Sequence, residues 1–235
     1  MKIPLSPRLR CCCNFITSGD RVADVGTDHG YLGIWLLQKG LASQVIASDI
    51  GEGPLSAAKA NAQRFGCTDR MHFCLSDGLE AVPRDFDVLV IAGMGAKTMI
   101  HILQNAPWLQ SSGYRLILQP QNKPHLLRAY LSECGWYISR EALVRDGRFL
   151  YAVMEVLWQP QQPKLTQGQC WFSPALLENP SAEVTEYYGR IVGGLRKAAL
   201  NRQEPQLLSA LEELEALANT QAYSFLKEAS YDHSE

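Results

Sequence analysis

Short apolar runs alternate with segments of helical periodicity over the first two thirds of the chain. The runs predicted to be strands cover residues 21–27, 44–50, 71–76, 86–92, 114–119, 136–144 and 149–158. The helices predicted among them cover residues 31–39, 53–65, 97–109 and 124–134. The fourth run is almost uniformly apolar, as expected of a central parallel strand that is buried on both faces.

This alternation predicts an α/β fold with a largely parallel, Rossmann-like seven-stranded sheet. The last two strands follow one another without a helix, so we expect a hairpin that adds one antiparallel strand. Doubly wound sheets bind their ligands at the carboxyl ends of the parallel strands. Residues directly after the predicted strands are therefore the first candidates for a functional site.

Both ends of the chain carry additional helices. Leu5-Ser-Pro-Arg-Leu9 is typical of a helix start, with Ser6 as the N-cap and Pro7 at the first helical position. Near the C-terminus apolar residues recur at helical spacing as Val184, Tyr187, Ile191, Leu195 and Ala198, and again as Leu207, Leu211, Leu214 and Ala218. We expect a small α-helical domain there, an antiparallel hairpin of two helices.

A segment rich in Pro and Gln separates the two parts of the chain. The predicted organisation is a domain at residues 1–158 that includes the N-terminal helix, a linker at residues 159–173, and the helical hairpin at residues 174–235. Cations gather on the first helix of the hairpin and glutamates on the second. This segregation indicates pairing between the helices, a first helix that faces a substrate, or a dimerisation device.

The loop after the first strand carries the strongest chemical signal. In Asp24-Val-Gly26-Thr-Asp28-His29-Gly30 a strand end runs through a turn into a helix. A dinucleotide loop has a second glycine where this chain has Asp28, and the carboxylates of Asp24 and Asp28 would repel a diphosphate. They attract instead the cationic sulfonium and ammonium groups of S-adenosylmethionine (SAM). We interpret this stretch as a SAM-binding loop; a purely structural turn is the alternative.

Acidic residues also follow the second and third strands. Asp49 lies 25 residues after Asp24, close to where this fold places the carboxylate that binds ribose hydroxyls. Asp49 and the adjacent Ile50 are assigned to the cofactor site, although an Asp at a strand end can instead cap the next helix. Asp77 and Gly78 follow the third strand, where an acid can accept a hydrogen bond from an adenine amino group.

Residues after the fourth and fifth strands are candidates for substrate contacts. Gly93 and Met94 follow the fourth strand, and a glycine there allows close backbone approach to a flat ligand. Gln119, Gln121 and Lys123 lie at the end of the fifth strand. The two glutamines can hydrogen-bond a base edge, or they are ordinary surface residues.

Charge is unevenly distributed along the chain. The net charge of −2 argues against a general nucleic-acid-binding protein. Residues 1–158 contain 16 Lys and Arg against 14 Asp and Glu, a difference of +2, whereas residues 159–235 contain 6 against 10, a difference of −4. Residues 1–19 contain three cations, Lys2, Arg8 and Arg10, and no acid. They form either a solvated helix face or a patch that contacts phosphates.

Cysteine spacing and hydropathy exclude several classes of protein. The seven cysteines form no Cys-x-x-Cys pair, so we expect neither a metal site nor disulfides. The chain has no run of about 18 apolar residues and no apolar signal core at its start. These features predict a cytoplasmic protein that uses no metal and no membrane.

Taken together, these motifs resemble one family, the bacterial tRNA (adenine-22-N1)-methyltransferases. The resemblance covers nearly the whole chain and rests above all on Asp-Val-Gly-Thr-Asp-His-Gly at residues 24–30 and Ala-Gly-Met-Gly at residues 92–95. It implies a class I SAM-dependent methyltransferase domain, a coiled-coil-like helical pair, and methylation of N1 of an adenine in the D-arm of tRNA. The family usually has Pro at Gly33 and Gly at Ala96 and Ser173, so the methyl group of Ala96 is expected near the target pocket.

The chemistry of the implied reaction suggests roles for individual residues, which we state as a hypothesis. Adenine N1 carries a lone pair at pH 7, so positioning matters more than a general base. Asp28 is expected to stabilise the positive charge on the methylated base or to take up its amino proton. Tyr31 and Met94 are expected to stack on the base, although Tyr31 can equally be helix packing. His29 is expected to order the loop or contact the cofactor.

Other functions are compatible with the same sequence. A methyltransferase acting on another RNA position or on a small molecule would share the SAM site, and a non-catalytic module would bind SAM or RNA without transfer. Asp28 disfavours an NAD-dependent oxidoreductase. A monomer is expected rather than a dimer.

Overall fold

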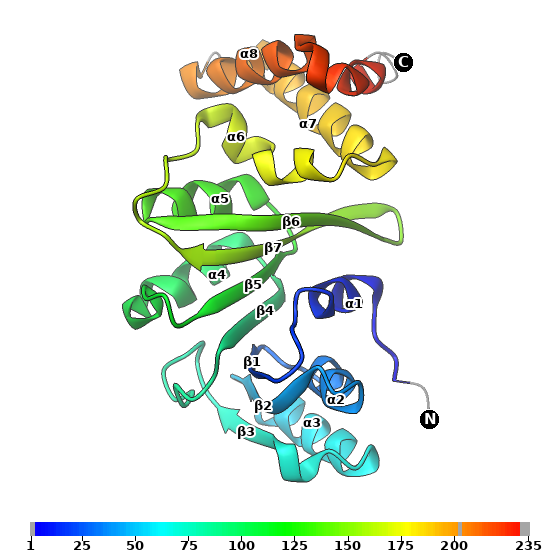
Figure 1. The fold of residues 1–235 in the computed structure, drawn as a ribbon, viewed down its shortest axis with the longest axis vertical. Coiled ribbons are helices and arrows are strands. Elements are labelled where there is room, and N and C mark those ends of the chain that lie inside the picture. Colours follow the sequence, from blue (N-terminus) through cyan, green and yellow to red (C-terminus); the bar gives the residue numbers. More distant parts are fainter. Residues whose placement is uncertain (1–2, 202–203, 231–235) are drawn as a thin grey trace.

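Seven strands of the described chain form one mixed sheet in the order β3-β2-β1-β4-β5-β7-β6 (Figure 1). The computed structural model describes residues 3–201 and 204–230. The strands are β1 (Asp20–Val25), β2 (Ala42–Asp49), β3 (Met71–Leu75), β4 (Val88–Met94), β5 (Arg115–Pro120), β6 (Trp136–Asp146) and β7 (Phe149–Trp158). Strands β1 to β5 run parallel, and β7 runs antiparallel to β5 and β6. The predicted sheet, with one antiparallel strand from the final hairpin, is confirmed.

Helices cover both faces of the sheet. They are α1 (Pro7–Cys13), α2 (Tyr31–Gln38), α3 (Glu52–Arg64), α4 (Ala96–Gln104) and α5 (Pro124–Glu133), with the short 3-10 helices η1 (Thr68–Arg70) and η2 (Pro107–Leu109). The helix predicted at residues 97–109 is divided, because α4 ends at Gln104 and η2 begins at Pro107. Proline disfavours the helical conformation of the residue before it, which accounts for the break.

Two hydrophobic clusters lie between the sheet and its helices, one on each face. In β4, Leu89 and Ile91 belong to one cluster, whereas Val88 and Val90 belong to the other, and all four are fully buried. The alternation follows from the two-residue period of a strand. It confirms that this strand is buried on both faces.

The N-terminal helix begins as predicted. Ser6 is the N-cap and its Oγ accepts a hydrogen bond from the backbone N–H of Leu9 at 3.4 Å, while Pro7 occupies the first position. Figure 1 shows α1 beside the β6–β7 hairpin. Arg8 donates from Nε to the carboxylate of Asp146 in that hairpin at 2.8 Å. These contacts hold α1 against the sheet.

The cysteines are free thiols, and four of them, Cys12, Cys13, Cys67 and Cys170, are buried. Burial raises the pKa of Cys13 to about 12, so this thiol is protonated at neutral pH. Within residues 3–201 and 204–230, no helix combines the length and the apolar character that a membrane crossing requires.

The C-terminal part contains α6 (Gln167–Trp171), η3 (Pro174–Glu178), α7 (Ala182–Asn201), α8 (Pro205–Asn219) and η4 (Gln221–Ser230). The linker predicted at residues 159–173 is therefore irregular only over its first half, because α6 begins at Gln167. Thr166 and Gln169 form a capping box at the start of α6, a signal present in the sequence. Phe172 is 1% exposed and belongs to the core of the C-terminal helices. The domain boundary itself stays a prediction.

Helix α7 buries a set of residues that only partly matches the predicted periodicity. Val184 and Leu195 are buried as expected, but Tyr188 and Val192 are buried in the cluster shared with α8, whereas Tyr187 and Ile191 are only partly buried. The two middle positions differ by one residue because α7 carries two adjacent apolar stripes. Arg196 and Glu215 pair across the two helices at 2.8 Å, which supports the account of the charge segregation as interhelical pairing. Residues 202, 203 and 231–235 of the predicted hairpin lie outside the described residues.

A buried ion pair connects the C-terminal part of the chain to helix α5 and strand β6. Arg128 and Glu141 are both fully buried and lie 2.6 Å apart. The Arg128 guanidinium also donates to the backbone oxygens of Cys170 and Trp171. Burial alone would lower the pKa of Arg128, but the charge of Glu141 raises it overall, so the guanidinium stays protonated. One side chain thus connects α5, β6 and α6.

Replacing Arg128 with Met is expected to lower the free energy of unfolding by about 3–5 kcal/mol, because it leaves the Glu141 carboxylate buried without a partner. Urea unfolding measures the loss. Arg196→Met is the matched control, since the Arg196–Glu215 pair is 45% and 42% exposed and exposed pairs contribute about 1 kcal/mol at most. Equal losses in the two variants would contradict the special role of the buried pair.

Candidate active site

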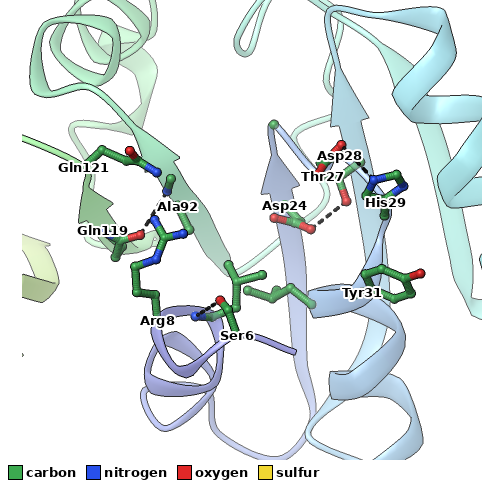
Figure 2. Close-up of a pocket in the computed structure, with 14 residues that line it drawn as sticks. Ser6, Arg8, Asp24, Thr27, Asp28, His29, Tyr31, Ala92, Gln119 and Gln121 are labelled. Carbon is green, nitrogen blue, oxygen red and sulfur yellow. Dashed lines mark hydrogen bonds and ion pairs between the residues drawn. The ribbon is translucent and has the colours of Figure 1, made fainter. Parts of the chain in front are cut away.

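A cavity of about 240 Å³ opens at the carboxyl ends of β1, β4 and β5 (Figure 2). It lies where the strand order reverses between β1 and β4, the point at which doubly wound sheets bind ligands. Figure 2 shows Asp24, Thr27 and His29 on one side of the cavity, and Arg8 rising from α1 toward Gln119 and Gln121 on the other. The cavity therefore has an acidic wall and an amide-rich wall.

The acidic wall is formed by the loop between β1 and α2. Gly26, Asp28 and Gly30 adopt φ angles of 77°, 51° and 72°, a left-handed conformation that glycine adopts freely and that Asp tolerates better than most residues. The backbone N–H of Asp28 donates to Oδ2 of Asp49 at 3.1 Å. This geometry leaves the Asp28 side chain 71% exposed at the rim of the cavity.

Asp24 is a buried carboxylate, 4% exposed, at the inner end of this loop. The Thr27 hydroxyl donates to it at 2.7 Å, and it forms no ion pair with any cation that the structure describes. Burial raises the pKa of Asp24 to about 6; the Thr27 hydrogen bond lowers it, and the nearby charge of Asp49 raises it. A cationic ligand group beside Asp24 would offset the cost of burying its charge.

On the other side of the cavity, β4 ends in a bulge at Gly93. The register with β5 shifts between Ala92 and Met94, and Gly93 adopts a φ of 79°. Its N–H leaves the sheet ladder and donates to Oε1 of Gln119 at 3.1 Å. The Gln119 amide thereby holds the backbone of the Gly93 bulge at this wall of the cavity.

The structure brings most of the predicted site residues together. Those that line the cavity are Arg8, Asp24, Gly26, Asp28, His29, Tyr31, Gly93, Gln119 and Gln121. Gly30 is the N-cap of α2 beside them. Asp49, Ile50, Asp77 and Gly78 do not line this cavity but follow β2 and β3 at the same edge. Ile50 is 70% exposed there, an apolar surface suited to a flat ring.

Three expectations about individual side chains are corrected. Met94 lies outside the cavity lining because its Cε packs on the loop, 2.2 Å from where a Cβ on Gly26 would stand. Gln119 is fully buried and hydrogen-bonded, so it positions the Gly93 loop and offers no free edge to a base. Ala96 is fully buried in the core and is not among the residues that line the cavity.

Arg10 and Lys123 lie apart from the residues that line the cavity. Arg10 is exposed on α1, and Lys123 is exposed at the start of α5, so neither lines the cavity. Lys2 lies outside the described residues. The lining also includes residues that were not predicted: Ser6, Leu9, Thr27, Leu32 and Ala92. Thr27 stands inside the loop motif and was detectable; the others depend on where α1 packs.

The cavity is suited to SAM and unsuited to a diphosphate. Asp28 stands at the N-terminus of α2, where a phosphate would otherwise bind. Asp24 supplies a buried negative charge without a cationic partner. At the outer edge, both Asp49 oxygens already accept one backbone N–H each, from Gly51 and Asp28, and each keeps a free lone pair for a ribose hydroxyl.

The family model described as a methyltransferase domain matches residues 5–154. The chain belongs to this methyltransferase family. It is 30% identical over 154 residues to the tRNA (adenine(22)-N(1))-methyltransferase of Bacillus subtilis, covering 65% of each chain, so the match spans about two thirds of that relative. A proposed tRNA methyltransferase of Mycoplasma pneumoniae is 34% identical over 175 residues, which are 72% of this chain and 79% of that one.

A solved structure matches the methyltransferase over almost its whole length. The M. capricolum TrmK structure, a complex with S-adenosylhomocysteine, has a TM-score of 0.73 and 26% identity over 95% of this chain and 98% of that one. The resemblance and the fold expected from the sequence are confirmed, including the helices after the sheet.

Replacing Asp24 with Asn is expected to stabilise the ligand-free protein at pH 8. The folded pKa of about 6 exceeds the ordinary 3.8, so folding takes up a proton between these values and stability falls as pH rises through about 4 to 6. Two pKa units correspond to about 3 kcal/mol at pH 8 and to nothing below pH 3.

Thermal unfolding of the Asp24→Asn variant and the wild type at pH 8 and pH 4 measures the effect. The gain in melting temperature should be present at pH 8 and mostly lost at pH 4. Asp69→Asn, on the exposed helix η1, is the control and should leave the melting temperature unchanged at both pH values. An Asn variant less stable than the wild type at pH 8 would refute the interpretation of Asp24.

Proposed function

We propose that this methyltransferase transfers a methyl group from SAM to N1 of an adenine in tRNA, at the position numbered 22 in its relatives. The observation that carries the proposal is the cavity at the β1–β4 switch point, with the buried Asp24 carboxylate, which forms no ion pair with any described residue. The B. subtilis relative is named for this reaction, and the M. capricolum neighbour binds the demethylated cofactor.

The cofactor is held by the residues of the acidic wall and of the adjoining strand ends. Asp24, Gly26 and Gly30 surround its cationic end, Asp49 binds the ribose, and Ile50, Asp77 and Gly78 contact the adenine. When bound, SAM supplies an electrophilic methyl group on a positively charged sulfur. The Gly93 bulge keeps the β4 end free of side-chain bulk, so a flat base can approach from the Gln121 side.

The chain's own residues then orient the target base. N1 needs no strong base before it attacks, so holding it in line provides most of the acceleration, about 7–11 kcal/mol in well-aligned reactions. Asp28, exposed at the rim, stabilises the positive charge that methylation leaves on the base. Tyr31 stacks on the base, and its ring lies 5.8 Å from that of His29, which orders this side of the loop.

Substrate RNA approaches over α1 and the start of α5. Adenine N1 lies on the pairing edge, so the base must leave its stack to reach the cavity. Arg10 and Lys123 contact phosphates, and Arg8, which pairs with Asp146, contributes from the cavity wall. The enzyme acts in the cytoplasm as a monomer that requires no metal.

Incubation of the purified protein with labelled SAM and unmodified bulk tRNA is expected to place the label in 1-methyladenosine. Digestion to nucleosides, chromatography and mass measurement identify the product. Asp28→Ala and Asp49→Ala should lower kcat/KM by at least about a hundredfold, and Asp69→Ala should leave it unchanged. Label in another nucleoside would overturn the target atom. SAM binding without any transfer would favour a small-molecule methyltransferase or a non-catalytic module.

Replacing Arg10 with Glu is expected to weaken tRNA binding while leaving the affinity for SAM unchanged, because Arg10 is exposed and lies outside the cavity. Filter binding at several salt concentrations should show lower affinity and a salt slope smaller by about 1. Lys39→Glu, at the C-terminal end of α2, is the control. An unchanged affinity in the Arg10 variant would remove α1 from the RNA-binding surface.

A further inference from the structure

A second cavity, of about 310 Å³, lies between the β5–α5 loop, β7, α6 and α7. Four aromatic rings contribute to its walls: His125, Tyr151, Trp171 and Tyr187. We refer to it as the aromatic pocket. These rings come from segments that are far apart in the sequence, and the site described above uses none of them.

The firmest wall of the aromatic pocket is a stacked pair of rings. The rings of His125 and Trp171 are nearly parallel, with an interplanar angle of 13° and centroids 3.7 Å apart. Burial, followed by the charges of Arg128 and Lys123, lowers the pKa of His125 to about 4. The imidazole is therefore neutral at pH 7 and stacks as an uncharged aromatic ring. Flat rings of this kind are the surfaces on which nucleic-acid bases stack.

The rim of the pocket is polar and carries positive charge. Gln121 and Asn122 place side-chain amides there, and Lys123 stands at the start of α5. Lys123 adopts a left-handed φ of 48° and forms no ion pair with any residue that the structure describes. Among the described residues that line the pocket there is no carboxylate. This combination favours an anionic ligand with a flat ring.

The aromatic pocket adjoins the cofactor cavity. Gln121 lines both, and its backbone N–H donates to the carbonyl of Met94 at 2.8 Å. Arg8 lines the cofactor cavity, and its guanidinium lies 4.8 Å from the centre of the Tyr151 ring, which faces the aromatic pocket. The two cavities are thus neighbours on the side of the Gly93 bulge, where the target base must stand.

The second apolar stripe of α7 completes this surface. Tyr187 and Ile191 line the pocket, and with Gly194 and Ala198 they continue into a shallow apolar groove along the helix. The neighbouring stripe, with Tyr188 and Val192, supplies the packing against α8. The packing of the C-terminal helices therefore leaves the second stripe available to a ligand.

We propose that the aromatic pocket binds the base of a nucleotide next to the target adenine, with Lys123 at the adjoining phosphate. The inference rests on the proposed function and adds a second base-binding subsite to it. Stacked rings without acidic neighbours suit a base and its phosphate, and the shared Gln121 places the subsite beside the target. Occupying both cavities at once would hold the target base outside its helix.

The test compares the affinities of variants for an unmodified tRNA transcript without SAM, by filter binding. His125→Ala should weaken binding about tenfold, the typical effect of losing one stacking partner. His125→Phe, which keeps a ring, should restore most of the affinity. Lys123→Ala should weaken binding and reduce its salt dependence. The affinity for SAM, measured separately, should stay unchanged in all three, as should tRNA binding by the controls His72→Ala and Lys39→Ala.

Transcripts that lack one base beside the target adenine show which neighbouring base contacts the aromatic pocket. If the neighbouring base occupies the pocket, an abasic nucleotide on one side of the target should weaken binding to the wild type and abolish the further effect of His125→Ala. If His125→Ala weakens binding to both abasic transcripts as much as it weakens binding to the intact tRNA, the subsite is refuted. Wild-type affinity of the His125→Ala and Lys123→Ala proteins while tRNA methylation stays normal would also refute it. A wild-type protein that methylates no tRNA would overturn the proposed function, and this inference with it.

Discussion

The parallel pairing of β1 with β4 at the centre of the sheet is the constraint on which the site depends. Asp24 lies opposite Val90 and Val25 opposite Ile91. Both strands run toward the same edge of the sheet, where β1 ends at Val25 and β4 continues to Met94. The loops after them diverge because the strand order reverses at this pair. The cavity is the space that this divergence leaves, and the residues assigned to the methyl donor lie at or just beyond the carboxyl ends of β1, β2, β3 and β4.

Burial in that sheet gives Asp24 its chemistry. A carboxylate at the buried end of β1 has lost most of its water, and among the described residues only the Thr27 hydroxyl donates a hydrogen bond to it. The pKa of Asp24 is raised because its charged form is unfavourable in the buried, ligand-free site. A cationic ligand removes the same penalty, so the feature that weakens the fold strengthens selection for a sulfonium nucleoside over a dinucleotide.

A second constraint connects the C-terminal helices to this site. The buried Arg128 pairs with Glu141 and with backbone oxygens at the end of α6, which fixes Trp171 against His125. The aromatic pocket exists only while this arrangement holds, because α5 and β7 contribute one part of its wall, and α6 and α7 the other. The position of the C-terminal part relative to the cavity is therefore set by electrostatics in the core as well as by apolar packing.

Local periodicity and the turn and capping residues were enough to predict the strands, the order of the elements, the Ser6 cap and the acidic loop from Asp24 to Gly30. Three features could not be predicted in this way: Gln119 is buried under Gly93, Met94 packs on Gly26, and α7 buries Tyr188 more deeply than Tyr187. The tertiary structure also brought Arg8 onto Tyr151 across the sheet edge. Such features depend on contacts between segments distant in sequence, and a single amphipathic pattern is compatible with more than one of them.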